Sequence, residues 1–180
     1  MDQSSAVWIL IVLALVTANL PFLIERPLLV LPWALPGESE RPQWLRWAES
    51  LAFFVLLVAL AYAVLVLIGQ SFFAGASAAA VGLFVLKVVV AMAVAAAILA
   101  YAGWRNRGRE VHKSFFVRLL EVLVFYGLVG ALGFAFEANI GNVFHQTWEF
   151  YAVTLSLFLV LGYPGFVYRY LLRRRKGRGS

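Results

Sequence analysis

The sequence predicts an all-α integral membrane protein with five transmembrane helices, the N-terminus outside and the C-terminus in the cytoplasm. Hydrophobic residues make up 63% of the chain and charged residues 13%, whereas about a quarter of the residues in soluble proteins are charged. Five apolar segments are each about 20 residues long, the length that crosses a bilayer as a helix. Lys and Arg gather in alternate connections between these segments, which is the pattern that orients membrane proteins.

The predicted spans form one transmembrane domain over all 180 residues. They cover residues 6–23, 48–69, 78–102, 115–136 and 150–171, and a basic tail follows at 172–180. A cleaved signal peptide is the alternative for the first span, but the start MDQSS lacks the positive charge of such a peptide. Near the end of this span, Pro21 removes a backbone donor, and Asn19 can bond the freed carbonyl or a neighbouring helix. The simpler interpretation is a helix that ends at the membrane interface.

The first connection, residues 24–47, contains four prolines and three tryptophans. Prolines at this density forbid one continuous helix, and tryptophan suits the lipid head-group region. We therefore predict a short surface-lying segment, PLLVLPWAL, followed by a polar loop. The segment could dock a partner protein or serve as an ordinary interfacial connector.

The third predicted span is rich in alanine and carries a charge. Its alanines would let another helix approach closely, because small side chains allow backbones to pack. Lys87 lies inside this span, about 13 Å from its outer end. An ammonium in the bilayer is costly unless it pairs or reaches the interface, so Lys87 is either functional or extends to the outer loop.

The fourth predicted span follows a basic segment, residues 104–115, that we expect to be solvated or to face lipid head groups. Arg118 and Glu121 are three residues apart and can pair on one helix face. Three glycines then recur every three residues and predict a smooth helix-packing stripe. These are Gly127, Gly130 and Gly133.

The polar stretch of residues 137–151 contains no Lys or Arg and lies between two apolar segments. We interpret it as an outer-face recognition segment. Its candidate contact residues are Glu137, Asn139, Asn142, Trp148 and Glu149. In the fifth span, Pro164 and Gly165 interrupt the helix near its end, where tyrosines predict an aromatic girdle.

The distribution of positive charge predicts the topology. The N-terminus and the second and fourth connections contain no Lys or Arg, and Lys87 alone lies well inside a span. The remaining basic residues flank the spans on the cytoplasmic side, where they meet anionic lipid rather than nucleic acid. A bacterial inner-membrane protein with several spans is the expected localisation.

The sequence offers little for catalysis or cofactor binding. It contains no Cys, and its two histidines are predicted on opposite sides of the membrane, His112 inside and His145 outside. Neither has a partner at helical ligand spacing, so we expect no metal, haem or other cofactor. Glu137, His145 and Glu149 could converge on the outer face, but their spacing matches no hydrolase. We predict a protein that is not an enzyme.

Lys87 and Glu121 define an alternative, a small transporter or proton-conducting protein. Their depths differ by roughly 8 to 12 Å in a core about 30 Å thick, so direct contact is not expected. A relay through water would be needed.

Both ends of the chain resemble a small family of uncharacterised bacterial integral membrane proteins. The resemblance covers about residues 1–26 and 113–171. It rests on MDQ at 1–3, ANLPF at 18–22, RLLE at 118–121, LVGAL at 128–132, EA at 137–138, WEFYAVTL at 148–155 and PGFVYR at 164–169. Relatives of this kind have about a hundred residues and three spans, so residues 28–112 would be an insertion that adds two spans and preserves orientation.

The resemblance also implies a function, because genes of this family often follow those of the respiratory NADH:quinone oxidoreductase. Together with the glycine stripe, it makes our leading hypothesis a non-enzymatic accessory or assembly partner of that complex. The expected partners are the lipid bilayer and subunits of the complex, and a homo-oligomer is also open. A membrane enzyme acting on lipid or quinone has the weakest basis, since no nucleophile and base are paired.

Overall fold

The computed structural model describes residues 3–70, 78–109, 111–141 and 145–172, and within them all regular structure is helical. The α-helices are α1 Gln3–Leu23, α2 Gln43–Gly69, α3 Ala78–Arg105, α4 Phe115–Ile140, α5 Trp148–Leu161 and α6 Tyr163–Val167, and a π-helical turn, η1, covers Tyr168–Leu172. Five stretches are long and apolar enough to cross a membrane, the fifth being the continuous run from α5 through η1. The predicted all-helical class with five such stretches is confirmed.

Two of the helices extend well beyond the predicted spans. α2 begins five residues earlier than predicted, directly after Pro42, which cannot continue a helix toward the N-terminus. α4 begins after Ser114, whose hydroxyl accepts a hydrogen bond from the Val117 N–H, and it continues to Ile140. Gly141 ends it at φ 78°, the left-handed conformation that favours glycine. The first residues of the polar stretch 137–151 are therefore the last turn of α4.

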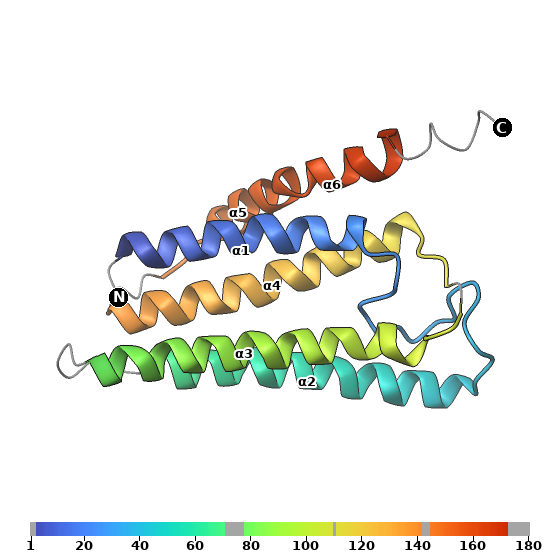
Figure 1. Ribbon diagram of the computed structural model, residues 1–180, viewed down its shortest axis with the longest axis horizontal. Helices are drawn as coiled ribbons and strands as arrows, with labels where there is room; N and C mark the ends of the chain where they lie inside the picture. Colours follow the sequence, from blue (N-terminus) through green and yellow to red (C-terminus); the bar gives the residue numbers. More distant parts are fainter. Residues whose placement is uncertain (1–2, 71–77, 110, 142–144, 173–180) are drawn as a thin grey trace.

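The helices pack in the spatial order α3, α2, α4, α1, and then α5 with α6 (Figure 1). α2 and α3 lie along one side of the bundle, α5 and α6 along the other, and α1 and α4 between them. α2 approaches α4 closely at Gly69, where an added Cβ would lie 3.2 Å from the Cβ of Ala138. Helices from the two ends of the sequence thus lie side by side, since α1 contacts both α5 and α6.

The connection between α1 and α2 does not lie on the surface as predicted. Its leucines and valine, Leu28 to Leu31 and Leu35, are buried in one core cluster with Phe53 of α2 and Leu99 of α3. The prolines prevent a helix here, and the apolar run fills the space between the ends of α1, α3 and α4. The prediction of a surface-lying segment is wrong for these residues, although Trp33 stays exposed. We call this end of the bundle, formed by residues 24–42, 105–109 and 111–118, the basic end.

Candidate functional site

A buried ion pair joins the start of α4 to the segment before it. The Lys113 Nζ lies 2.7 Å from Glu121 Oε2, and both side chains are 0% exposed. The other oxygen of Glu121 accepts a hydrogen bond of 2.8 Å from the Leu28 N–H. Glu121 therefore connects residues 24–42 with α4, and its ion-pair partner is Lys113 rather than the expected Arg118.

Burial also changes the acidity of Lys113. Removal of the ammonium from water lowers the pKa of Lys113 to about 8, even though the attraction of Glu121 opposes this effect. Lys113 therefore remains mostly protonated at neutral pH.

Arg118 caps the end of α1 instead of pairing with an acid. Its Nη1 donates hydrogen bonds to the carbonyl oxygens of Pro21, at 2.5 Å, and Ile24, at 3.4 Å. The last four carbonyls of a helix lack partners within it, and a cation is favoured at this end of the helix dipole. The side chain is 2% exposed, and its Nε has no hydrogen-bond partner among the described residues.

Asn19 bridges the break between α5 and α6. In an uninterrupted helix, the N–H of Gly165 would bond the carbonyl of Leu161. Here the Asn19 carboxamide lies between them: its Nδ2 donates to Leu161 O at 2.9 Å, and its Oδ1 accepts from the Gly165 N–H at 2.6 Å. Asn19 thus replaces one lost backbone hydrogen bond with two from α1. A Cβ on Gly165 would lie 2.8 Å from that Oδ1, so the bridge requires glycine.

The short motifs at the two ends of the sequence therefore meet at one end of the structure. ANLPF in α1 contacts both RLLE in α4 and PGF in α6, through Pro21 with Arg118 and through Asn19 with Gly165. Phe22 and Phe166 add an edge-to-face contact with ring centroids 6.0 Å apart. From the sequence, a neighbouring helix was one predicted partner of Asn19, and Pro164 with Gly165 was predicted to interrupt the last span, but the two features were not connected with each other. The signals for this contact were a polar amide in the first span and a helix interruption in the last span, because each needs a hydrogen-bond partner.

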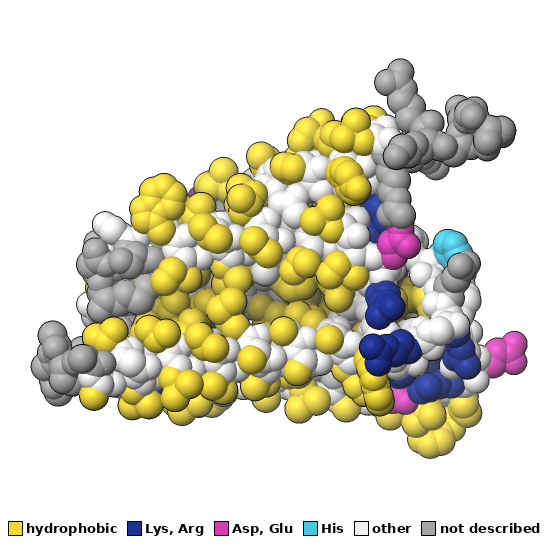
Figure 2. Space-filling view, viewed as in Figure 1, with side chains coloured by type: hydrophobic (Ala, Val, Ile, Leu, Met, Phe, Trp, Pro, Cys, Tyr) yellow, Lys and Arg dark blue, Asp and Glu magenta, His cyan; other side chains and the backbone are white. Residues whose placement is uncertain are grey.

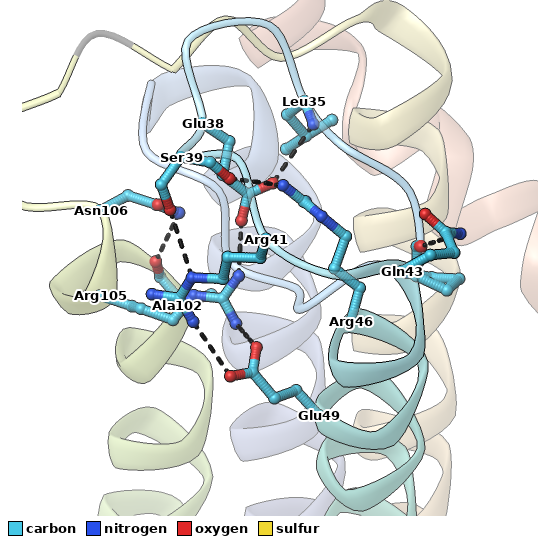
Figure 3. A network of polar contacts seen from close by, with 11 residues as sticks. Leu35, Glu38, Ser39, Arg41, Gln43, Arg46, Glu49, Ala102, Arg105 and Asn106 are labelled. Atoms are coloured by element: carbon cyan, nitrogen blue, oxygen red, sulfur yellow. Dashed lines mark hydrogen bonds and ion pairs between the residues drawn. The ribbon is translucent and has the colours of Figure 1, made fainter.

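A second ionic network ties the first connection to α2 and α3 (Figure 3). Glu38 accepts from Arg46, at 2.9 Å, and from Arg105, at 2.5 Å. Arg105 also pairs with Glu49, which Arg41 contacts at 3.0 Å. The Arg46 and Arg105 side chains are 4% and 9% exposed. Arg105 is therefore not solvated as expected for residues 104–115, whereas Arg107 and Arg109 of that segment are exposed.

The network holds Glu38 ionised. Burial alone would raise its pKa, but the Leu35 N–H and the guanidinium groups of Arg105 and Arg46 keep the pKa of Glu38 below its usual value. Glu38 consequently fixes the loop to two helices at neutral pH.

The last turn of α2, at the end of the bundle away from the basic end, receives hydrogen bonds from Lys87 and Asn139. The Lys87 Nζ donates to the carbonyl of Leu67 at 3.1 Å, and the Asn139 Nδ2 donates to the carbonyl of Ile68 at 3.2 Å. Both acceptors lie in the last turn of α2, where carbonyls need partners from outside the helix. Lys87 and Glu121 therefore bond groups at opposite ends of the bundle.

The glycine stripe of α4 is mostly open. A Cβ on Gly133 would reach Leu10 at 3.6 Å, an ordinary contact, whereas a Cβ on Gly127 or Gly130 would meet nothing within 4 Å. Close helix contact at glycine occurs instead at Gly69, between α2 and α4, and at Gly162, between α5 and α6, where an added Cβ would lie 3.0 Å from the carbonyl oxygen of Ala18.

The other outer-face candidates are dispersed. Gln146 contacts Glu137 at 3.5 Å, Trp148 is 74% exposed, and Glu149 is exposed in the first turn of α5. Asn142 lies outside the described residues. Among the described residues, no three His, Asp or Glu side chains gather as metal ligands would.

A protein-family model described as a protein of unknown function (DUF2818) matches the chain twice, over residues 6–102 and 85–173. Together the two matches run from α1 to η1 and include the central residues that the resemblance of the two ends left out. No curated protein and no solved structure matches the chain.

Proposed function

The chain belongs to the DUF2818 family of proteins of unknown function, and we propose that it acts as a non-enzymatic accessory or assembly partner of a larger membrane complex. The observation that carries this proposal is the open face of α4 at Gly127 and Gly130. The ionisable groups considered for catalysis or conduction support it as well. Glu121 bonds Lys113 and Lys87 bonds α2, which are contacts that hold the fold together.

The open face lies between two aromatic side chains of α4 that contact α5. One turn before Gly130, the Tyr126 hydroxyl lies 2.8 Å from the Thr154 hydroxyl, and one turn after it Phe134 packs on Phe150. Between these contacts, Gly127 is exposed and Gly130 is half-buried, so part of the α4 backbone remains accessible. Small residues in apolar helices are where another helix approaches closely in a bilayer. A partner helix would therefore cross α4 at Gly130.

We take respiratory NADH:quinone oxidoreductase as the partner, on the strength of the family resemblance. Trp148 and Glu149 would add contacts beyond the apolar region, because both are exposed at the start of α5. The site of action would be the bacterial inner membrane.

Gly130→Leu is expected to abolish association with the complex while the protein still folds, because a Cβ added at Gly130 meets nothing within 4 Å among the described residues. Gly82→Leu is the matched control: Gly82 lies in α3, is exposed and has nothing within 4 Å of an added Cβ. Both variants would be tagged, extracted in mild detergent and separated on native gels, with co-migrating subunits identified by mass spectrometry. Equal recovery of subunits with wild type and Gly130→Leu would refute the assigned face, and migration of the wild type alone would refute a stable partnership.

The topology can be tested because the chain has no Cys. The positive-inside rule places the basic end in the cytoplasm and the start of α5 outside. We expect His145→Cys to react with a membrane-impermeant thiol reagent in intact spheroplasts, and Arg109→Cys to react only after the cells are opened. The reverse labelling pattern would overturn the assigned orientation.

A further inference from the structure

An apolar groove opens between α1 and α3. No extensive packing joins these two helices; they form the walls, and α2 and α4 form the floor. The cavity has a volume of about 410 Å³, within the range of small-ligand sites. Figure 2 shows this face as an apolar hollow along the bundle, with Lys and Arg side chains gathered at its right-hand end.

Small side chains on α3 create the groove. Ala91, Ala95, Ala96 and Ala100 line it, so the alanines that we expected to pack against a helix face an open space. Its lining is hydrocarbon apart from Thr17, whose hydroxyl already donates to the Leu13 carbonyl at 2.7 Å. An occupant of the groove itself must therefore be apolar.

The length of the groove matches one leaflet. Its α3 wall runs from Ala91 to Ala100, about 14 Å at 1.5 Å per residue, close to half of a hydrocarbon core about 30 Å thick. It begins near the middle of α3 and ends beside the basic end. A lipid chain in one leaflet has this reach, whereas a transmembrane helix needs a contact surface across the whole core.

A basic side chain lies at the mouth of the groove. Arg26 is exposed and sits between Ile24 and Leu28, which both line the groove. Its stem crosses Gly103 of α3, where an added Cβ would lie 3.4 Å from Arg26 Cβ and 3.7 Å from its Cδ. Three neighbouring arginines already bond acceptors within the protein, namely Arg46, Arg105 and Arg118. No acidic partner of Arg26 is found among the described residues.

We propose that the groove binds an acyl chain of an acidic phospholipid whose phosphate pairs with the Arg26 guanidinium. The groove supplies apolar contact along one leaflet, and Arg26 supplies a strong, directional phosphate ligand at head-group depth. This inference goes beyond the proposed accessory role, and it concerns a different face from that of Gly130, so each can fail alone.

Native mass spectrometry of the delipidated full chain tests the proposal, with phosphatidylglycerol and phosphatidylcholine of identical acyl chains as probes. We expect wild type to bind phosphatidylglycerol roughly fivefold more tightly, the effect of about one basic residue beside anionic lipid. Arg26→Gln should erase this preference, weakening phosphatidylglycerol binding more than phosphatidylcholine binding, because the choline ammonium already offsets the charge of the phosphate in phosphatidylcholine. Ala95→Phe, which fills the groove, should weaken binding of both lipids. Arg109→Gln, at an exposed arginine that does not line the groove, should behave as wild type.

Three results would overturn the proposal. Equal affinity of wild type for the two lipids would remove the role of Arg26, and an equal loss in Arg26→Gln and Arg109→Gln would show general attraction to the basic end. A bound polypeptide that only Ala95→Phe releases would instead identify the groove as a partner interface. Circular dichroism of each variant would verify that it is folded.

Discussion

Replacing Lys113 with Met is expected to lower the free energy of unfolding by about 3–5 kcal/mol, the cost of removing one partner from a buried ion pair. Both side chains of the pair are 0% exposed, and the ammonium lies 2.7 Å from the Glu121 carboxylate. In the variant, this carboxylate keeps the Leu28 N–H but loses its counter-ion in an apolar setting. A buried charge without a counter-ion is the reason for the large effect.

A second substitution should restore most of this loss. Lys113→Met combined with Glu121→Gln removes both charges, and the Gln oxygen can still accept from the Leu28 N–H. Replacing both members of a buried pair is often neutral, so we expect the double variant within about 1–2 kcal/mol of wild type. Exposed Arg109→Met is the control, with an expected change within about 0.5 kcal/mol.

Reversible unfolding in mixed micelles, driven by increasing SDS and followed by circular dichroism, would measure these differences. If Lys113→Met were as stable as wild type, the ion pair would contribute nothing to the free energy of unfolding. A double variant no better than the single one would show that Lys113 acts through packing of its methylene stem instead of its charge.

The helical class could be predicted from the sequence because apolar length is a local property. Each of the five spans is visible in about 20 consecutive residues, and the structure has a long apolar helix at each of them. The burial of residues 28–31 could not be predicted in this way. Their apolar run suits both a membrane surface and a protein core, and the choice depends on the distant ends of α3 and α4 that cover it.

The partners of the polar side chains were harder still to predict, because they lie far away in the sequence. Arg118 lies one helical turn before Glu121, yet Glu121 pairs with Lys113. The Arg118 guanidinium is not available, because it donates hydrogen bonds to carbonyl oxygens at the end of α1. Lys87 was recognised as costly, with a functional role or reach to the outer loop as the two alternatives, and its Nζ bonds the Leu67 carbonyl in the last turn of α2. Local spacing identified which side chains need a partner, but only the packing of helices identified the partner.

Asn19→Leu is expected to destabilise the protein by roughly 1–3 kcal/mol for each backbone group that it leaves unpaired. Two such groups depend on Asn19, the Leu161 carbonyl and the Gly165 N–H, at 2.9 and 2.6 Å. The loss should be largest within lipid, where water cannot replace the missing bonds. Asn19→Asp should be intermediate, because a carboxylate can accept from Gly165 but cannot donate to Leu161 unless it is protonated.

Gly165→Ala tests the same bridge from the other side. Its Cβ would lie 2.8 Å from Asn19 Oδ1 and 3.2 Å from the Phe22 Cβ, so α6 must move away from α1 and the bridge must break. Gly130→Ala, with nothing within 4 Å of its Cβ, is the matched control and should be neutral or slightly stabilising. The same unfolding measurement in micelles would compare the variants.

The decisive result is the coupling between the two sites. If Asn19 and Gly165 act as one unit, Gly165→Ala should cost much less in an Asn19→Leu background than in wild type, because the bridge is already lost there. Additive costs would show that Gly165 is needed only for the close approach of α6 to α1. Strong coupling would mean that the break in the last span depends on a side chain of the first span, which explains why these two short motifs, 146 residues apart, belong to one structural element.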